Sequence, residues 1–558
     1  MGAMASTREE RKRVGAAAVG PAEGAERRQL WRRCSLVTTG RRWFGGLSRR
    51  WFGGLSRVEV FHRVGPLAVL VLLVTSYAVC YGMWSVRRYA ALNAPAFDMG
   101  IFDQGVWLLS RFKNPFVTIL GLNLFGDHLC FTMLAFVPLY WLWPGPETLL
   151  VVQAMVLAVG AIPVYLLAAR VLEHRWFATI PAFAYLLAPA LGWLNLENFH
   201  PDSLEVPLAL FALYFATRGR WRWYLAMVIP LMLVKEETVL FLVPLGIYVA
   251  VLHNRRIGLL TVGLSIAWFV VGFFGIQPAL SGAAAGSLDS WRIPFGGFGG
   301  LVKTAFQRPW EVIAYMLTAE KIKYIIQLLT PLLFLPLLTW RSLLALPVLL
   351  YNLISNFWYQ SNLQYHYHSM LTPVLWATGL LALGRFHRVI VRRTLVMVVL
   401  VAAMFSAFLW GPLPGSRQPS YYGDPQRPEV LAANEAFALI PGDASVSAID
   451  KFAAHLANRE EIYVYPNPYS ASYWGDDSMK GQRLPAAEKV EYVMVVPGLM
   501  GEVAARVYEG LAGEGFEPIY DKQGVVLLHR ELSAEAGGVL TEYRARSKLR
   551  VSHDTTTP

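Results

Sequence analysis

The chain has 558 residues, of which 55% are hydrophobic and only 16% are charged. A soluble globular domain carries about 25% charged residues, so this composition excludes an ordinary soluble enzyme and indicates a membrane protein. The formal net charge of +12 lies mostly at the N-terminus, because residues 1–63 hold 14 Lys and Arg against five Glu and the other 495 residues carry only +3.

The first predicted element is this basic segment, residues 1–63. It is rich in Ala, Gly and Arg and has no apolar block of membrane-spanning length. We expect a disordered cytoplasmic tail that lies against anionic lipid headgroups, rather than an arm that binds nucleic acid.

Four long apolar blocks follow at intervals along the chain, and each is close to the roughly 20 residues that cross a bilayer as a helix. They are residues 66–84, 147–169, 257–277 and 394–410. Shorter apolar blocks fill the intervals between them. The pattern predicts an all-α polytopic membrane domain over residues 64–413, with about 11 transmembrane helices.

The orientation of this domain follows from its Lys and Arg residues, which collect on the cytoplasmic side of membrane proteins. Basic clusters occur at 170–175, 218–222, 255–256, 341 and 385–393. If these clusters and the N-terminus face the cytoplasm, the outer segments are 87–128, 195–202, 235–237, 278–323 and 356–368. The same count predicts that residues 129–143 lie in the outer interface without crossing, and that the protein is a multi-pass protein of the plasma membrane.

After residue 413 the composition becomes that of a soluble domain. Short β-rich runs at 445–449, 461–465, 492–496 and 525–529 alternate with helical patterns at 429–439 and 502–511. This alternation predicts a small extracytoplasmic α/β domain over residues 414–532. Residues 533–558 are polar and are expected to be a disordered tail.

Charged side chains at membrane depth cost several kcal/mol, so those of the outer segments are functional candidates. The first segment offers Asp98, Asp103 and His128. On one helix Asp98 and Asp103 would point about 140° apart, so they need not share a site. Each of these residues could instead be a local cap or a hydrogen-bonded structural group.

The second and third outer segments add acids, an imidazole and an amine. Glu197, His200 and Asp202 fall within six residues, and Lys235 and Glu236 stand between two apolar runs. Carboxylates mixed with imidazoles suit general acid–base chemistry or a divalent cation. We therefore expect Mg²⁺ or Mn²⁺ as the only cofactor, with the candidate ligands Asp98, His128, Glu197 and His200.

In the fifth outer segment, aromatic residues alternate with amides and imidazoles. Tyr365, His366 and His368 could line a site for a sugar or a lipid headgroup. Aromatic residues at this depth equally form the ordinary interfacial belt of membrane proteins.

Five of these motifs together resemble a known family: FDMGIFDQGVW, GDH, ENFHPDSLEVP, VKEE and QYHYHSMLTP. The chain resembles, over about residues 66–385, a bacterial membrane family named only as a domain of unknown function and allied to the GT-C fold glycosyltransferases. The resemblance implies sugar transfer from a polyprenyl-phosphate donor at the outer face of the membrane. It implies a catalytic base at Asp98 or Asp103 and an acidic role for Glu197 or Asp202. The paired Asp-Asp typical of that superfamily is missing at Asp98, which leaves the metal requirement open.

The leading hypothesis is an inverting glycosyltransferase that acts on an envelope glycan, lipid or protein acceptor. His128, His200, Asp202, Lys235, Glu236 and the fifth-segment residues would bind substrate, and Lys235, Lys321 or Lys323 would neutralise the departing phosphate. The alternatives are a transporter or flippase of a lipid-linked or anionic substrate, and a non-catalytic scaffold for envelope assembly. Polar residues gather on one side and no repeat is apparent among the spans, which favours the enzyme over a transporter.

Overall fold

The computed structural model of the protein describes residues 57–284, 286, 290–473 and 478–531. The predicted tail over residues 533–558 lies outside the described residues, as does most of the predicted tail over residues 1–63. Residues 57–63 are not tail, because they begin the first long helix. All contacts reported below lie within the compact unit that begins at His62.

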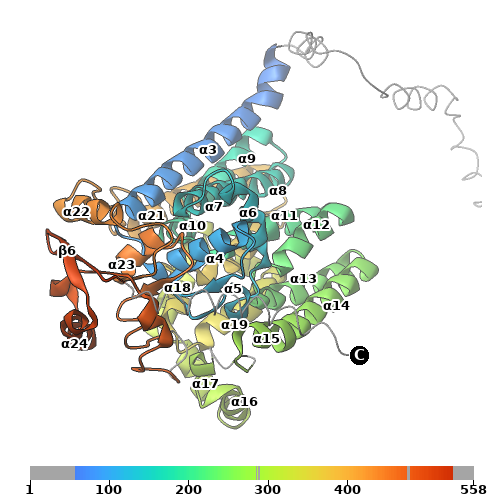
Figure 1. The fold of residues 1–558 in the computed structure, drawn as a ribbon. Coiled ribbons are helices and arrows are strands. Elements are labelled where there is room, and N and C mark those ends of the chain that lie inside the picture. The colour runs from blue at the N-terminus through green and yellow to red at the C-terminus, as the bar shows by residue number, and fades with distance from the viewer. Residues whose placement is uncertain (1–56, 285, 287–289, 474–477, 532–558) are drawn as a thin grey trace, which may run out of the picture. The chain divides into compact units, whose positions relative to one another are not determined.

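Four helical segments of the described chain are long and apolar enough to cross a membrane, and they coincide with the four long blocks of the sequence. The helices α3, α7, α14 and α21 labelled in Figure 1 belong to them. The four segments are α3 (Arg57–Ala90), α7 with α8 (Pro146–Val159, Ala161–Val171), α14 to α15 (Arg255–Val271 to Gln277–Ser281) and α21 (Val389–Trp410).

A fifth span is formed if one bent pair of helices counts as a single crossing. Helices α9 (Arg175–Leu186) and α10 (Pro189–Leu196) meet at 49°. Pro189 stands at the first position of α10, where it cannot continue the hydrogen bonds of α9. The polar end of α10 leads directly into the second predicted outer segment.

The expected number of about 11 crossings is wrong by this measure, because four or five segments of the described chain qualify. The shorter apolar blocks form helices that are too short to cross the hydrocarbon core. A helix of 13 residues, such as α11, is about 20 Å long, whereas the hydrocarbon core is about 30 Å thick. The short helices are α4 (Ile101–Ser110), α11 (Glu205–Thr217), α12 (Trp221–Met232), α13 (Val239–Leu252), α16 (Gly297–Gln307), α17 (Pro309–Met316), α18 (Ala319–Leu329), α19 (Leu346–Ile354) and α20 (Leu371–Leu383).

The segment predicted to lie in the interface, residues 129–143, contains one short apolar helix from Phe131 to Tyr140. Its 10 residues are too few to cross a bilayer as a helix. Residues Leu124–Asp127 form a further helical turn, α5, directly before it.

The small C-terminal sheet is present, in the strand order β4-β3-β5-β7-β6. Strand β3 pairs parallel with β4 and β5, and β7 pairs antiparallel with β5 and β6. Strand β6 was not predicted. The elements are α22 (Pro428–Phe437), β3 (Val446–Ala448), α23 (Asp450–Ala453), β4 (Ile462–Val464), β5 (Tyr492–Val495), α24 (Glu502–Leu511), β6 (Glu517–Lys522) and β7 (Val525–His529).

One face of this sheet shares a hydrophobic core with the segment that follows α3. Side chains alternate along a strand, so Tyr492 and Met494 face one side of the sheet while Val493 and Val495 face the other. The first side packs with buried residues of the first predicted outer segment, such as Ile101 and Leu124. The C-terminal elements are therefore packed directly onto the segment that carries Asp98.

Candidate functional site

A cavity of about 440 Å³ lies where the predicted outer segments meet. Its walls come from the turn before α4, the end of α5, the end of α10, the start of α13 and the loops around α19. The lining residues are Arg88, Pro95, Phe97, Asp98, Ile101, Phe102, Asp127, His128, Trp193, Glu197, Asn198, His200, Asp202, Lys235, Arg292, Phe357, Tyr359, Gln364, Tyr365, His366 and Tyr367.

Asp98 reaches this cavity from a strained turn, Ala96–Gly100, that precedes α4. Its backbone has φ 70° and ψ −73°, which L residues rarely adopt and which surrounding structure must hold in place. Asp450 supplies part of that restraint, because its Oδ1 accepts hydrogen bonds from the amides of Ala96 (2.9 Å) and Phe97 (3.4 Å). Burial, and then the charge of Asp202, raise the pKa of the Asp98 carboxyl to about 7.

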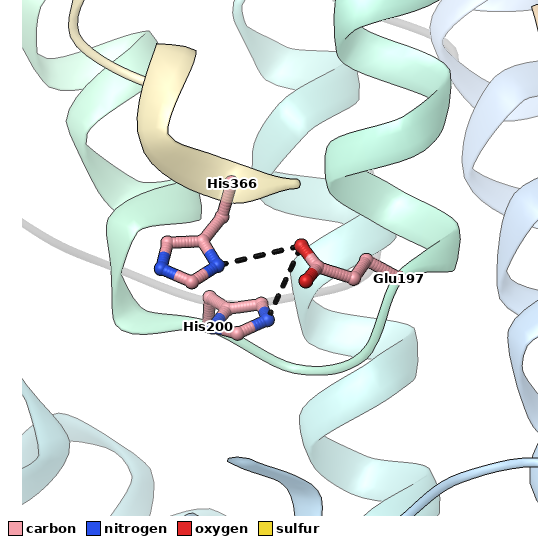
Figure 2. A group of neighbouring side chains, drawn as sticks. All are labelled: Glu197, His200 and His366. Atoms are coloured by element: carbon pink, nitrogen blue, oxygen red, sulfur yellow. Dashed lines mark hydrogen bonds and ion pairs between the residues drawn. The ribbon is translucent and has the colours of Figure 1, made fainter. Parts of the chain in front are cut away.

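Glu197, His200 and His366 form a tight group on the same cavity (Figure 2). The Glu197 Oε2 atom lies 3.3 Å from Nδ1 of His366 and 3.5 Å from Nε2 of His200. The two imidazole rings are stacked with their centroids 3.8 Å apart. One donor atom from each residue lies within 4.8 Å of the others, a spacing that could hold a metal ion.

The protonation of the two imidazoles suits a cation, whereas burial, and then the charge of Asp98, raise the pKa of the Glu197 carboxyl well above its usual range, so a cation would have to displace its proton. Burial lowers the pKa of His200 to about 4 and holds that of His366 well below its usual range, so both imidazoles are neutral at pH 7 and offer lone pairs. The buried Nε2 atom of His200 has no hydrogen-bond partner among the described residues. Oδ2 of Asp98 lies 4.0 Å from that atom, which makes Asp98 the nearest further carboxylate.

Lys235 is a buried amine in the wall of the cavity. Its Nζ lies 3.5 Å from Oδ1 of Asp202 and 3.7 Å from Oε2 of Glu237. Glu237 is held in turn by a 2.6 Å hydrogen bond from the Tyr351 hydroxyl. Burial alone would lower the pKa of Lys235, but Asp202 and Glu237 raise it well above its usual range, so the amine stays charged.

His128 and Glu236 form a second buried ion pair, with Nδ1 and Oε1 2.7 Å apart. The other carboxylate oxygen of Glu236 accepts a 3.1 Å hydrogen bond from the backbone N–H of Leu129. Burial and Lys235 act to lower the pKa of His128, but Asp127 and Glu236 raise it to about 9. Burial acts to raise the pKa of Glu236, but His128 lowers it to about 2.

Most of the candidate residues therefore meet at one cavity. Asp98, His128, Glu197 and His200 line it together, and so do Asp202, Lys235, Tyr365 and His366. Glu236 contributes through its contact with His128. Their functional roles stay predictions.

Three candidate side chains have other partners than the sequence analysis expected. Asp103 is buried outside the cavity, where its Oδ1 accepts a 2.7 Å hydrogen bond from the Tyr140 hydroxyl. His368 is also outside the cavity, where its Nε2 contacts the carbonyl of Leu363 at 3.1 Å. His128 is paired with Glu236 and does not join the metal-binding group.

The lysines expected to face a phosphate are also placed elsewhere, except for Lys235. Lys321 lies 3.9 Å over the ring of Tyr315 and donates to the Leu353 carbonyl, and neither it nor Lys323 lines the cavity. The lining cations that the sequence analysis missed are Arg88 and Arg292. The basic last turn of the helix Arg57–Ala90 was a usable signal for Arg88, whereas Arg292 ends the short 3₁₀ helix Ser290–Arg292, which has no distinguishing sequence pattern.

Comparison with known proteins places the chain in a family. No significant match is found among the curated proteins. Among solved structures, the chain is similar to that titled "Crystal Structure of ArnT from Cupriavidus metallidurans bound to Undecaprenyl phosphate", at 14% sequence identity and a TM-score of 0.49, with 83% of this chain and 98% of that chain covered. The family model "Predicted membrane protein (DUF2079)" matches residues 88–501, which include the cavity and most of the C-terminal sheet. As its motifs predicted, the chain belongs to the DUF2079 family of membrane proteins.

Proposed function

We propose that this protein is a GT-C-type membrane glycosyltransferase that moves a sugar from a polyprenyl-phosphate donor to an envelope acceptor at the outer face of the plasma membrane. The observation that carries the proposal is the composition of the cavity. A carboxylate on a strained turn, Asp98, shares it with three Lys and Arg side chains and with seven Phe, Tyr and Trp side chains. These are the groups needed to activate a hydroxyl, to stabilise a phosphate and to hold a sugar ring.

Asp98 is the proposed general base. Its carboxylate takes the proton of the acceptor hydroxyl while the acceptor oxygen forms a bond to the anomeric carbon of the sugar. The bond between that carbon and the phosphate oxygen breaks on the opposite side, so the configuration inverts and polyprenyl phosphate leaves. A pKa of about 7 suits this role, because a base works best when its pKa lies near the working pH.

Arg88, Lys235 and Arg292 are the proposed partners of the leaving phosphate. The pairing of Lys235 with Asp202 and Glu237 fixes the position of the amine. Arg292 stacks 4.9 Å over the Phe357 ring, which holds its guanidinium at the cavity wall. Guanidinium groups bind phosphate in bidentate fashion, so we assign the larger share of phosphate binding to Arg88 and Arg292.

We further propose that a divalent cation binds Glu197, His200 and His366, with Asp98 adjacent. The support is that Nε2 of His200 makes no hydrogen bond, although it lies 3.5 Å from Oε2 of Glu197, and that the three donor atoms are close together. Two imidazoles with carboxylates favour Mn²⁺ over Mg²⁺, which prefers oxygen ligands alone. Such an ion would supply positive charge for the donor phosphate in a cavity rich in carboxylates.

Mass spectrometry of a deletion strain tests this function. Envelope glycans and lipid-linked sugars would be compared in strains complemented with wild type, Asp98→Asn, or the exposed control Asp521→Asn. We expect the deletion to lose one glycan substituent and accumulate its polyprenyl-phosphate sugar, with rescue by wild type and Asp521→Asn only. Full rescue by Asp98→Asn at equal protein level would overturn the proposed base, and an unchanged glycan profile in the deletion strain would overturn the glycosyltransferase.

A further inference from the structure

Helices α16 and α17 carry an outward-facing apolar surface. Phe298, Phe306 and Trp310 are 71%, 87% and 63% exposed, and Ile313 and Leu317 continue the row. Their spacing of three, four or eight residues places the members within each helix on one side of it. The exposed apolar residues of the two helices are here called the α16–α17 stripe.

The protein-facing side of these helices is small. Within these two fully described helices only Thr304 and Val312 are buried. Val312 lies two positions after Trp310, about 200° around the helix, so the apolar stripe faces away from the protein. A helix on a water-facing surface has the reverse arrangement, with its apolar side turned inward.

We propose that the α16–α17 stripe is inserted into the lipid leaflet on the cavity's side of the membrane. The helices have 11 and eight residues, too few to span, so they would lie along the interface. Lys303 is exposed outside the stripe, where it can reach lipid phosphates, and Arg308 is also exposed, in an ion pair of 3.0 Å with Glu311. The apolar surface also continues onto α18 through the exposed Ile322 and Ile326, as expected for a surface immersed in lipid.

Two hydrogen bonds connect this surface to the cavity. The Tyr315 hydroxyl of α17 donates to Oδ1 of Asn356 at 2.6 Å, and the backbone N–H of Asn356 donates to the backbone carbonyl of Arg292 at 2.8 Å. Arg292 and the neighbouring Phe357 line the cavity. The stripe would therefore bring the bilayer next to the side of the cavity that Arg292 lines. On that side a lipid-linked donor could enter, a role that rests on the proposed function. The lipid contact itself does not depend on that function.

Site-specific fluorescence tests the lipid contact. An environment-sensitive thiol label would be attached at Phe306→Cys or Ile313→Cys, with Glu509→Cys on the exposed side of α24 as the water-facing control. The exposed Cys80 is first replaced by Ser, as is Cys34, whereas the buried Cys130 is kept. The protein is reconstituted in phosphatidylcholine–phosphatidylglycerol vesicles that contain a spin-labelled lipid quencher, and iodide serves as the aqueous quencher.

We expect labels at 306 and 313 to be blue-shifted, quenched by the spin-labelled lipid and protected from iodide, with the reverse at 509. Iodide quenching at 306 and 313 equal to that at 509 would overturn the proposal. Protection from both quenchers would also overturn it, because a protein partner would then cover the stripe. Tyr315→Phe should leave the quenching unchanged and raise the KM for the lipid donor. If no transfer is measurable at all, the proposed function fails while the quenching result still decides the lipid contact.

Discussion

The ion pair between His128 and Glu236 allows a quantitative test of the cavity's electrostatics. Glu236→Gln keeps the shape of the side chain and removes its charge. The rise in the pKa of His128 from 6.5 to about 9 corresponds to about 3 kcal/mol in favour of the charged imidazole in the folded state, which is the net effect of burial and Lys235 against Asp127 and Glu236. Breaking a buried pair by removing one partner costs about 3–5 kcal/mol, so both routes agree. The lowered pKa of Glu236 reflects the same interaction with His128, so its free energy is not added to this figure.

The pH dependence of this effect has a definite sign. The folded-state pKa of His128 is raised, so its stabilisation is full below about pH 6.5 and is lost as the pH rises through about 9. The pKa of Glu236 is lowered, so its stabilisation is present above about pH 4.5 and is lost as the pH falls towards about 2. The stability difference between wild type and Glu236→Gln is therefore largest near about pH 6 and shrinks above about pH 9.

The assay is unfolding by sodium dodecyl sulfate in mixed micelles, followed by tryptophan fluorescence at several pH values. A double-mutant cycle with His128→Ala isolates the coupling between the two side chains. We expect a coupling of about 3 kcal/mol at about pH 6. A coupling below about 1 kcal/mol there, typical of exposed pairs, or one that stays constant to about pH 10, would refute the reasoning.

Three further predictions concern the site and its supports. His200→Ala should weaken Mn²⁺ binding to the purified protein at least about tenfold in calorimetry, and unchanged binding would exclude the proposed ligand set. Asp450→Ala should speed hydrogen exchange at the Ala96 amide and lower kcat more than it raises KM, with both effects reversed by Asp450→Asn, which keeps an acceptor oxygen. Burial raises the pKa of Asp103 to about 8, so its carboxyl is mainly protonated at pH 7. Asp103→Asn should therefore change the free energy of unfolding by less than about 1 kcal/mol. It should also still complement a deletion strain, unlike Asp98→Asn.

The long spans and most of the C-terminal strands could be predicted because their signals are local. A charge-free block of about 20 residues has few alternatives to a membrane helix, and the runs at 446–448 and 492–495 are short, apolar and bounded by turns. The number of crossings could not be predicted in the same way. Whether a block of about 14 apolar residues spans or ends early depends on its neighbours, as α13 illustrates where it begins directly after the polar residues 235–238.

The gathering of the site residues could be predicted from charge topology, but their pairing could not. The positions of the basic clusters predict that Glu197 and His366 lie on one face of the membrane, yet the two residues are 169 positions apart and their 3.3 Å contact is set by tertiary packing. Asp103 has the same side chain as Asp98, and His368 has the same side chain as His366. The local backbone conformation decides which member of each pair lines the cavity, and the residue type does not reveal it. The restraint on Asp98 by Asp450 crosses from the C-terminal sheet and has no local signal.

The most direct test of the central claim is to follow the lipid product of the reaction. Purified protein would be incubated with membranes of a deletion strain, and polyprenyl phosphate and its sugar-linked forms would be quantified by liquid chromatography with mass spectrometry. The account predicts that wild type consumes one polyprenyl-phosphate sugar and releases polyprenyl phosphate in equal amount, while Asp98→Asn, folded to the same extent, does neither. Consumption at the wild-type rate by Asp98→Asn, or no consumption of any lipid-linked sugar by wild type, would contradict it.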